Sequence, residues 1–406
     1  MSNNWTQSFS TAARKTRPSP VRELLKVINR PGMISFAGGM PAPEVFPVEQ
    51  FAESADLLRT NGPLLLQYGT TEGYNPLREF LAKWTAPRMG REVGLDEMLL
   101  TTGSQQALDL FAWSMIDPGD VVITEDPTYM AAINTFANHS AEFASVRMDS
   151  EGMVVEELPA LIEKLRKEGK KVKFIYTIVN FQNPGGATMT VPRRKELAAI
   201  AERYGLTIFE DDPYGYVRFD GEHLPSIFSF DKAGNTIYAG SFSKILSPGV
   251  RIGWVSGAKE IIRQMTVFKQ TTDLCSSPLT QVLTYEYCKK GYLDSHLPSI
   301  VNNYRIKRDA MEKSFEKHLA PLGITWVKPE GGFFFWLNTG AIDSNDLAKR
   351  ALDKKVAILP GEPFCIDPAA GIHAARINYT YSQPSVIEEG VSRLAQAINE
   401  MKIPAK

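Results

Sequence analysis

Ser241-Phe-Ser-Lys-Ile-Leu-Ser-Pro-Gly-Val-Arg-Ile-Gly-Trp254 is the stretch on which the interpretation of this chain depends. It follows the apolar run 236–240, so it begins where a short strand is expected to end. Within eleven residues it places the amine of Lys244, the hydroxyls of Ser241 and Ser243 and the guanidinium of Arg251. An amine forms an imine with an aldehyde, and hydroxyls with an arginine fork bind a phosphate dianion through strong, directional hydrogen bonds.

Pyridoxal 5′-phosphate carries an aldehyde and a phosphate at opposite ends of one ring, so this loop predicts a binding site for that cofactor. The alternative is an ordinary surface lysine among loop serines, because a short motif by itself is only a hypothesis. The rest of the chain decides between the two interpretations.

Outward from this loop, residues 64–257 alternate apolar strand-like runs with amphipathic helical stretches. Strands are expected at 98–102, 121–124, 173–179, 206–209 and 236–240, and helices at 107–115 and 193–204. Apolar strands that alternate with helices indicate an α/β fold with a mostly parallel sheet covered by helices on both faces.

The C-terminal third has a different pattern, with a long charged helix expected at 298–319 and separate strands at 331–337, 356–361 and 376–381. This pattern predicts a smaller α+β domain to which the N-terminal arm contributes. We therefore expect residues 1–50 to form the arm and part of the small domain. Residues 51–297 would form the large domain, and residues 298–406 the rest of the small domain.

Polar residues follow several of the predicted strands. Because ligands in open α/β sheets bind outside the carboxyl ends of the strands, these residues can converge on one pocket. Ser104 and Gln105 stand between a strand and a helix, where backbone N–H groups favour a phosphate; Ser104 is equally suited to cap the helix. Asp211 follows a buried strand and would keep a pyridine nitrogen protonated, and a solvated Asp-Asp turn is the alternative.

The remaining candidates each have a structural alternative. Asn183 and Tyr214 could bond a phenolate oxygen, although Asn-Pro-Gly is also a common turn sequence. Tyr129 could lie on the cofactor ring or belong to the core. Arg376 is a charge inside an apolar strand, so it needs a partner. That partner is either a substrate carboxylate or a structural acid.

Composition excludes several classes of function. The net charge is −1, without a long basic run, so neither nucleic acid nor a membrane surface is an expected partner. The three cysteines are scattered and odd in number, which argues against a disulfide framework, and the five histidines show no metal-ligand spacing. Residues 1–20 are basic and free of acids, and we expect a flexible arm rather than a transit peptide. A cytoplasmic location follows from these expectations.

In this order along the chain, the elements resemble the fold type I pyridoxal-phosphate aminotransferases, whose large domain has a seven-stranded type of sheet. The matching positions are Tyr68, Gly103-Ser-Gln105, Asp126-Pro-Thr-Tyr129, Asn183-Pro-Gly185, Asp211-Asp-Pro-Tyr214, Ser241-Phe-Ser-Lys244, Arg251-Ile-Gly-Trp254 and Arg376. The resemblance covers nearly the whole chain, and as an ordered set these motifs are highly specific.

The resemblance implies a role for each matched residue. Lys244 would bind the cofactor covalently, Asp211 would pair with the ring nitrogen, and Asn183 with Tyr214 would bond the ring oxygen. Tyr129 would stack on the ring, and Arg376 would hold the α-carboxylate. The phosphate would be bound by Ser104, Gln105, Ser241, Ser243 and Arg251, with Tyr68 from a neighbouring subunit. A homodimer with shared active sites is therefore expected.

Within that family, the N-terminal part is similar to the 2-aminoadipate/kynurenine aminotransferase branch. The matching stretches are Ser19-Pro-Val-Arg22, Met33–Pro47 and Leu66–Tyr74. This resemblance implies that Gly39 approaches the substrate carboxylate and that Arg22, with Ser19, meets an acidic side chain.

The expected activity is a ping-pong transfer of an amino group from an L-amino acid to 2-oxoglutarate, in amino acid metabolism or biosynthesis. Pyridoxamine 5′-phosphate would be the form of the cofactor that carries the amino group. The donor is expected to be 2-aminoadipate, an aromatic amino acid, kynurenine or an aliphatic amino acid. A β-lyase or related enzyme on the same fold is the main alternative, and a non-catalytic sensor is a weaker one. A nicotinamide oxidoreductase lacks support, since no Gly-x-Gly-x-x-Gly follows a strand.

Overall fold

The large sheet is the centre of the molecule. The structure is a computed structural model that describes residues 5–10, 13–14, 16 and 31–402. The strands follow the order β2-β9-β8-β7-β6-β3-β4-β5. They are β2 (Met98–Thr101), β3 (Val121–Asp126), β4 (Glu142–Asp149), β5 (Gly152–Met153), β6 (Val172–Thr177), β7 (Thr207–Asp211), β8 (Thr236–Ser241) and β9 (Gly253–Ser256).

The prediction of a mostly parallel sheet is confirmed. Strands β4, β3, β6, β7 and β8 pair in parallel, whereas β9 is antiparallel to both of its neighbours. The two-residue β5 adds an antiparallel edge to β4, so the sheet is the expected seven strands with one short addition. All residues of β2 and β8 are buried, because helices cover both faces of the sheet.

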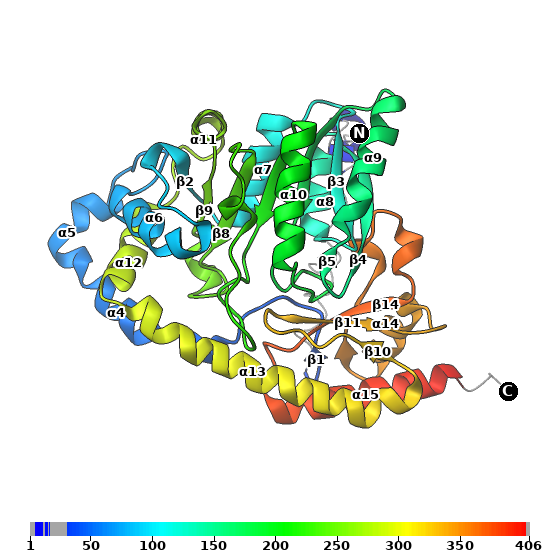
Figure 1. Cartoon of the computed structure of the whole chain (residues 1–406). Coiled ribbons are helices and arrows are strands. Elements are labelled where there is room, and N and C mark those ends of the chain that lie inside the picture. The colour runs from blue at the N-terminus through cyan, green and yellow to red at the C-terminus, as the bar shows by residue number, and fades with distance from the viewer. Residues whose placement is uncertain (1–4, 11–12, 15, 17–30, 403–406) are drawn as a thin grey trace.

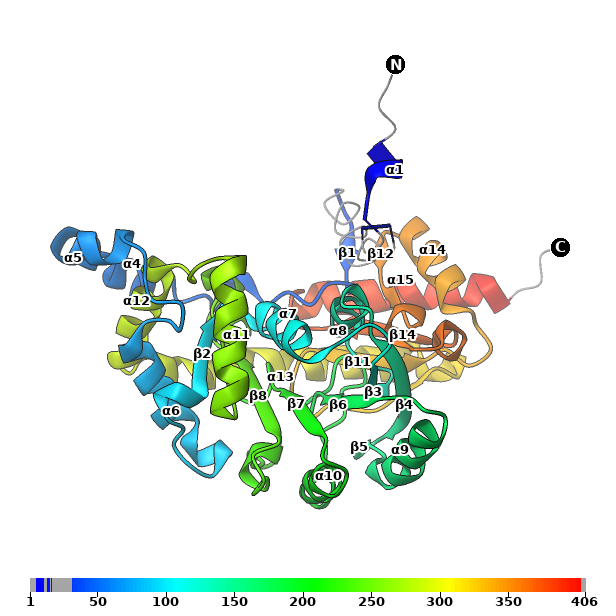
Figure 2. The same cartoon turned by 90° about the horizontal axis from the view of Figure 1, so that it is seen from above.

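The helices form two layers around this sheet, and Figure 2 shows α7 and α8 on one side with α9 and α10 on the other. The helices of this part are α4 (Val48–Ala55), α5 (Leu57–Leu66), α6 (Asn75–Met89), α7 (Ser104–Met115), α8 (Met130–Asn138), α9 (Leu158–Lys167), α10 (Val191–Tyr204), α11 (Lys259–Thr272) and α12 (Pro278–Lys289). A separate short helix, α1 (Trp5–Ser8), precedes them.

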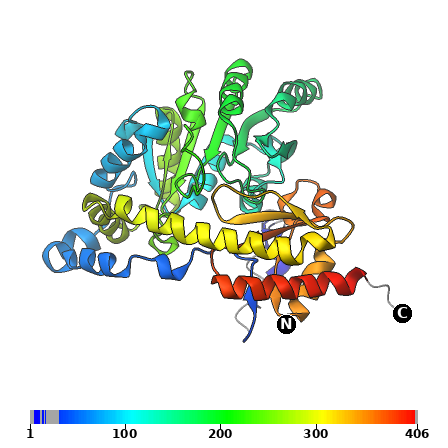
Figure 3. The ribbon, with the colours of Figure 1, turned by 60° about the horizontal axis from the view of Figure 1, so that its bottom comes forward.

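The C-terminal elements build a second, smaller sheet of order β10-β11-β14-β13, which is antiparallel throughout. Its strands are β10 (Thr325–Trp326), β11 (Phe334–Asn338), β13 (Leu359–Pro360) and β14 (Ala374–Asn378). Helices α13 (Tyr292–His318) and α15 (Pro384–Lys402) run side by side (Figures 1 and 3), and α14 (Ser344–Asp353) completes the unit.

The segment that enters from the N-terminal side joins this smaller unit. Strand β1 (Ile34–Ser35) pairs in parallel with β12 (Val356–Ala357). The long helix α13 begins at Tyr292, after Gly291, and thus several residues before the predicted start at Pro298. The domain limits at residues 50 and 297 stay predictions.

Short 3-10 turns connect the larger elements, at Pro43–Val45, Leu95–Glu97, Val155–Glu157, Ile227–Ser229, Pro248–Val250, Ala320–Leu322, Glu362–Phe364 and Pro368–Gly371. Among the described helices, none combines the length and the apolar character needed to cross a bilayer.

Candidate active site

A cavity of about 720 Å³ lies at the carboxyl ends of the central strands, and residues of the smaller unit also line it. This is the position at which parallel α/β sheets bind ligands. The cavity brings together most of the predicted site residues, namely Gly39, Ser104, Gln105, Tyr129, Asn183, Asp211, Tyr214, Ser241, Ser243, Lys244, Arg251 and Arg376.

Lys244 extends into this cavity from the loop after β8. Its Nζ donates a hydrogen bond to the carbonyl oxygen of Gly39 at 2.8 Å and lies 4.9 Å from the ring centroid of Phe333. Burial, together with the positive charges of Arg376 and Arg251, lowers the pKa of this amine to about 8. Near neutral pH a useful fraction of the amine is therefore uncharged, as a nucleophile or base requires.

Asp211 is the last residue of β7, whereas the strand expected at 206–209 would end two residues before it. Its Oδ2 accepts a hydrogen bond from the Tyr176 hydroxyl at 2.9 Å, while its Oδ1 is buried without a partner among the described residues. Burial raises the pKa of this carboxyl to about 7. Asp211 and Asp212 are both buried, so the alternative of a solvated turn is wrong. A buried acceptor that faces a cavity fits a ligand that carries a cationic donor.

An anion cradle lies between the start of α7 and the loop after β8. Gly103 precedes the helix with a φ of +75°, which favours glycine, and a Cβ there would lie 2.5 Å from Nη2 of Arg251, so a side chain would displace the guanidinium. Ser104 is the first helical residue, where free N–H groups and the helix dipole favour an anion. The hydroxyls of Ser241 and Ser243 are 2.9 Å apart at the same wall of the cavity.

Arg376 is buried in β14 and reaches the same cavity. Its Nη1 donates to Oδ1 of Asn183 at 2.9 Å, its Nη2 donates to the carbonyl of Ala37 at 2.8 Å, and its guanidinium lies 4.1 Å from the ring centroid of Phe334. Burial lowers its pKa to about 10. No aspartate or glutamate in the described ranges forms an ion pair with it, and its Nε has no hydrogen-bond partner there. Within the described part of the chain Arg376 therefore has no structural acid as its partner, and a ligand carboxylate fits.

One predicted site residue, Tyr68, is not brought to this cavity. Tyr68 is 76% exposed and lines a separate surface hollow with Asp273 and Pro278. Ser19 and Arg22 lie outside the described residues.

Polar residues of α8 that were not predicted also line the cavity, including Asn134 and Asn138. Their spacing of four residues places them on one helix face and was an available signal. Asn138 Oδ1 accepts a hydrogen bond from the hydroxyl of Thr16 at 2.9 Å, so a described part of the N-terminal segment reaches this side of the cavity. Tyr176, which holds Asp211, was also missed.

These residues fit pyridoxal 5′-phosphate on the chemistry of their donors and acceptors. The amine of Lys244, which has no acidic partner in the part of the chain that the structure describes, suits the aldehyde. The orphaned Oδ1 of Asp211 suits a protonated ring nitrogen, and the cradle around Arg251 suits the phosphate. The fold and the site thus define an enzyme of the pyridoxal-phosphate class.

Comparisons with known proteins identify the family. The model of the family "Aminotransferase class I and II" matches residues 37–394. An aromatic-amino-acid aminotransferase 1 of Thermococcus litoralis is 44% identical over 97% of this chain and 94% of its own length. A 2-aminoadipate transaminase of Thermus thermophilus is 38% identical over 97% of each chain. The crystal structure of a Pyrococcus horikoshii kynurenine aminotransferase, complexed with PMP, has a TM-score of 0.94 at 42% identity and covers 98% of this chain and 99% of that one.

The chain belongs to the class I and II aminotransferases, and its cofactor is pyridoxal 5′-phosphate. The prediction of a transaminase of fold type I is confirmed.

Proposed function

We propose that this aminotransferase moves the amino group of an aromatic, aliphatic or 2-aminoadipate-type L-amino acid to 2-oxoglutarate by a ping-pong mechanism. The observation that carries the proposal is the meeting of Lys244, Asp211 and Arg376 in one cavity. These three supply an amine, a buried carboxylate and a buried guanidinium, which the reaction needs in different places. When bound, the cofactor withdraws electrons from the α-carbon of the amino acid and so acidifies the proton there.

The residues of the cavity would have separate roles. Lys244 would bind the cofactor covalently and, once released, would remove the α-proton with its neutral Nζ. Asp211 would hold the ring nitrogen, and Asn183 with Tyr214 would bond the ring oxygen. Tyr129 would stack on the ring, and Gly39 would contact the substrate carboxylate. The phosphate would be bound by Ser104, Gln105, Ser241, Ser243 and Arg251.

Arg376 would bind the α-carboxylate through its planar fork, and this role gives a prediction. Arg376→Lys should raise the KM for both the amino donor and the 2-oxo acid by about 10- to 100-fold, because an ammonium cannot make the bidentate contact. Steady-state kinetics with each substrate measure this change. The absorbance of the bound cofactor should remain that of the unaltered enzyme, and unchanged KM values for every substrate would contradict the role.

The side-chain preference is supported by the cavity wall and by the relatives. Of the four aromatic positions 333–336 in the sequence, Phe334 lines the cavity, while Phe333 and Phe335 are fully buried in the core. An aromatic ring in the cavity wall fits aromatic and aliphatic side chains. The relatives named above act on aromatic amino acids, 2-aminoadipate and kynurenine. Arg22, with Ser19, would meet an acidic side chain.

An absorbance titration of the purified holoenzyme tests the proposed function. Glutamate, 2-aminoadipate, leucine, phenylalanine and kynurenine are added one at a time, and the spectrum is followed. We expect the band of the pyridoxal form to be replaced by that of the pyridoxamine form and to be restored by 2-oxoglutarate. A bound chromophore that no donor converts would contradict the proposed donors. Release of thiol, ammonia and pyruvate from an added S-substituted cysteine, whose thiolate can leave from the β-carbon, would favour a β-lyase.

We also propose a homodimer with shared active sites. The support is Tyr68, which is 76% exposed and lies outside the cavity of its own chain, as a residue that serves a neighbouring subunit would. A sedimentation coefficient of the size expected for a monomer, measured by analytical ultracentrifugation at the concentrations used in the assays, would contradict it. The three free cysteines are in keeping with a cytoplasmic enzyme, and a role in amino acid biosynthesis belongs to the same proposal.

A further inference from the structure

A buried ion pair lies directly behind the cavity. It joins Arg88, near the end of α6, to Asp212, the residue that follows β7. Nη2 of Arg88 lies 2.7 Å from Oδ2 of Asp212, and the two residues are 7% and 2% exposed. Asp212 does not line the cavity, whereas its neighbours Asp211, Pro213 and Tyr214 do.

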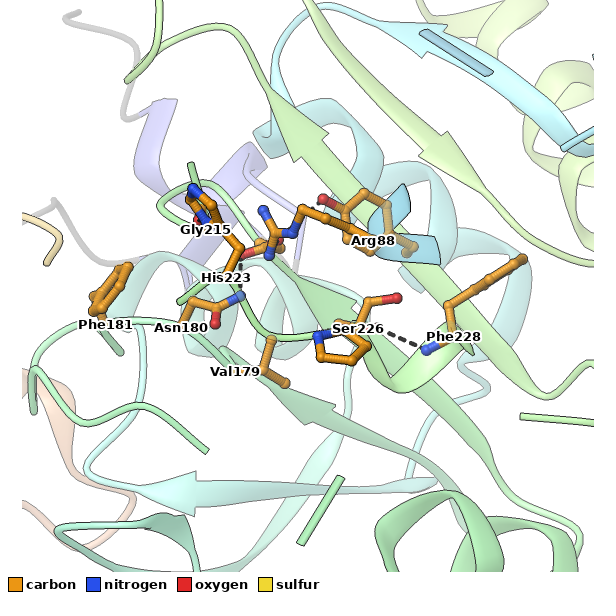
Figure 4. Close-up of polar contacts among 12 residues, drawn as sticks. Arg88, Val179, Asn180, Phe181, Gly215, His223, Ser226 and Phe228 are labelled. Carbon is orange, nitrogen blue, oxygen red and sulfur yellow. Dashed lines mark hydrogen bonds and ion pairs between the residues drawn. The ribbon is translucent and has the colours of Figure 1, made fainter. Parts of the chain in front are cut away.

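Asp212 also binds two further parts of the fold. Its Oδ1 accepts a hydrogen bond from Nδ2 of Asn180 at 2.7 Å, and its Oδ2 accepts one from the hydroxyl of Tyr238 in β8 at 3.0 Å. Figure 4 shows the side chain of Arg88 extended toward the region of Asn180 and Gly215. One carboxylate therefore joins α6, β8 and the segment after β6.

A second guanidinium extends this network. Arg194 of α10 is fully buried, and its Nη2 donates to Oδ1 of Asn180 at 2.7 Å and to the carbonyl of Val179 at 3.0 Å. Its Nη1 donates to the carbonyl of Pro225 at 2.8 Å. The NH2 group and the carbonyl oxygen of the Asn180 side chain are thus both engaged, so this side chain has a single orientation.

The glycine after Tyr214 shows how closely the chain packs on the ion pair. A Cβ on Gly215 would overlap the guanidinium of Arg88 and the carboxylate of Asp212. The turn that carries Asp211 and Tyr214 therefore rests directly on the pair. Asn180 is three residues from Asn183, so the same pair also holds the segment that carries this residue.

The positive charge of Arg88 affects the protonation of the site, in addition to the contacts that its side chain makes. Burial raises the pKa of Asp211, and the negative charge of Asp212 raises it further. Removal of Arg88 would leave Asp212 unpaired in the interior, next to the carboxylate that must stay ionised against the ring nitrogen. The paired guanidinium offsets that charge.

We propose that Arg88 and Asp212 are positioning residues for the transamination reaction, which hold Asp211, Tyr214 and Asn183 in one arrangement toward the cofactor. This inference rests on the proposed roles of those three residues. Arg88 and Asp212 touch neither cofactor nor substrate in this account, because they act through the turn and the segment that they brace.

The main test is Arg88→Met in the holoenzyme. We expect kcat to fall by about 10- to 100-fold, because small misplacements of reacting groups have effects of this size, while the KM of the amino donor changes by less than about threefold. The circular dichroism of the bound cofactor in the visible region should change, since it reports the orientation of the ring. Arg88→Lys should retain more activity than Arg88→Met. The double variant Arg88→Met/Asp212→Asn should recover part of the loss, because no charge is then left unpaired.

Arg78→Met is the matched control. Arg78 is a buried arginine of the same helix, and it binds the carbonyls of Leu95 and Met98 instead of Asp212. The Arg78→Met variant should have a lower melting temperature, with kcat and the visible circular dichroism unaltered. If Arg88→Met does the same, the inference is overturned. If Arg88→Met does not fold, Tyr238→Phe replaces it, and an unaltered kcat and spectrum in that variant overturn the inference.

Asp211→Asn separates this inference from the proposed function. If Asp211→Asn keeps full activity and an unaltered spectrum, the proposed role of Asp211 fails, and the positioning inference fails with it. If Asp211→Asn is impaired but Arg88→Met is not, only the inference about Arg88 and Asp212 fails.

Discussion

Lys244→Ala should lower kcat by about 10⁴-fold or more, because one residue supplies both the covalent attachment and the proton transfer. The pKa of this amine, at about 8, suits a base near neutral pH. Arg376 and Arg251 contribute to that low value through their positive charges. The two arginines that would bind the substrate carboxylate and the cofactor phosphate therefore also increase the uncharged fraction of the Lys244 amine.

The variant should remain folded and should still bind the cofactor without a covalent bond. The amine has no acidic partner among the described residues, so its removal leaves no buried carboxylate unpaired, and only the carbonyl of Gly39 loses a hydrogen bond. Borohydride treatment followed by mass spectrometry should find the cofactor attached to the unaltered protein and absent from the variant.

Lys307→Met is the matched control for Lys244→Ala. Lys307 is also buried, but its Nζ binds Glu44 and the carbonyl of Thr380, and it does not line the cavity. This variant should keep the covalent cofactor. Near-full activity of Lys244→Ala would rule out the role given to Lys244.

The fold could be predicted from the sequence where strands are continuous apolar runs. The strands found at 98–101, 121–126, 172–177 and 236–241 lie mostly buried between two layers of helices. Burial on both faces requires apolar residues at successive positions, and these runs made the strands predictable. Strand β4 was missed, since Glu142, Arg147 and Asp149 interrupt its apolar pattern. This strand lies near the edge of the sheet, where only β5 follows it, and so it is mostly half-buried.

Site residues could be predicted where reactive side chains lie at the ends of apolar strands. Lys244 and Asp211 follow or end apolar strands, so the sequence indicates both. Tyr176 could not be recognised, because a tyrosine within an apolar strand is typical of the core. The pair of Arg88 and Asp212 could not be predicted either, since it joins residues 124 positions apart and depends on the packing of α6.

Asp211→Asn should lower kcat by about 10²- to 10³-fold, the size expected when one buried electrostatic contact to the reacting system is removed. The amide keeps the shape and can still accept the hydrogen bond from Tyr176. It cannot hold a proton on the ring nitrogen, because it carries no charge. The absorbance of the bound cofactor, the steady-state kcat and the single-turnover rate constant of the half-reaction with the amino donor measure this loss.

The same substitution should make the cofactor-free protein more stable above about pH 7. The folded pKa of Asp211 is raised to about 7 by burial, whereas an unfolded aspartyl group has a pKa near 3.9. Ionisation therefore opposes folding, with a cost that is absent below about pH 4, grows between about pH 4 and 7, and is constant above that. At about pH 8 the cost is of order 4 kcal/mol, so Asp211→Asn should raise the melting temperature there and have little effect near pH 4.

Glu210→Gln separates this effect from the loss of any buried carboxylate. Burial also raises the pKa of Glu210 to about 7, but its oxygens accept the backbone N–H groups of Ile227 and Phe228, away from the cavity. This variant should keep kcat within a few-fold of the unaltered enzyme. A stabilised but inactive Asp211→Asn beside an active Glu210→Gln would mean that the unpaired oxygen of Asp211 is kept for the cofactor at the expense of stability. A destabilised Asp211→Asn at about pH 8 would mean that this carboxylate has a partner in the folded protein other than the cofactor.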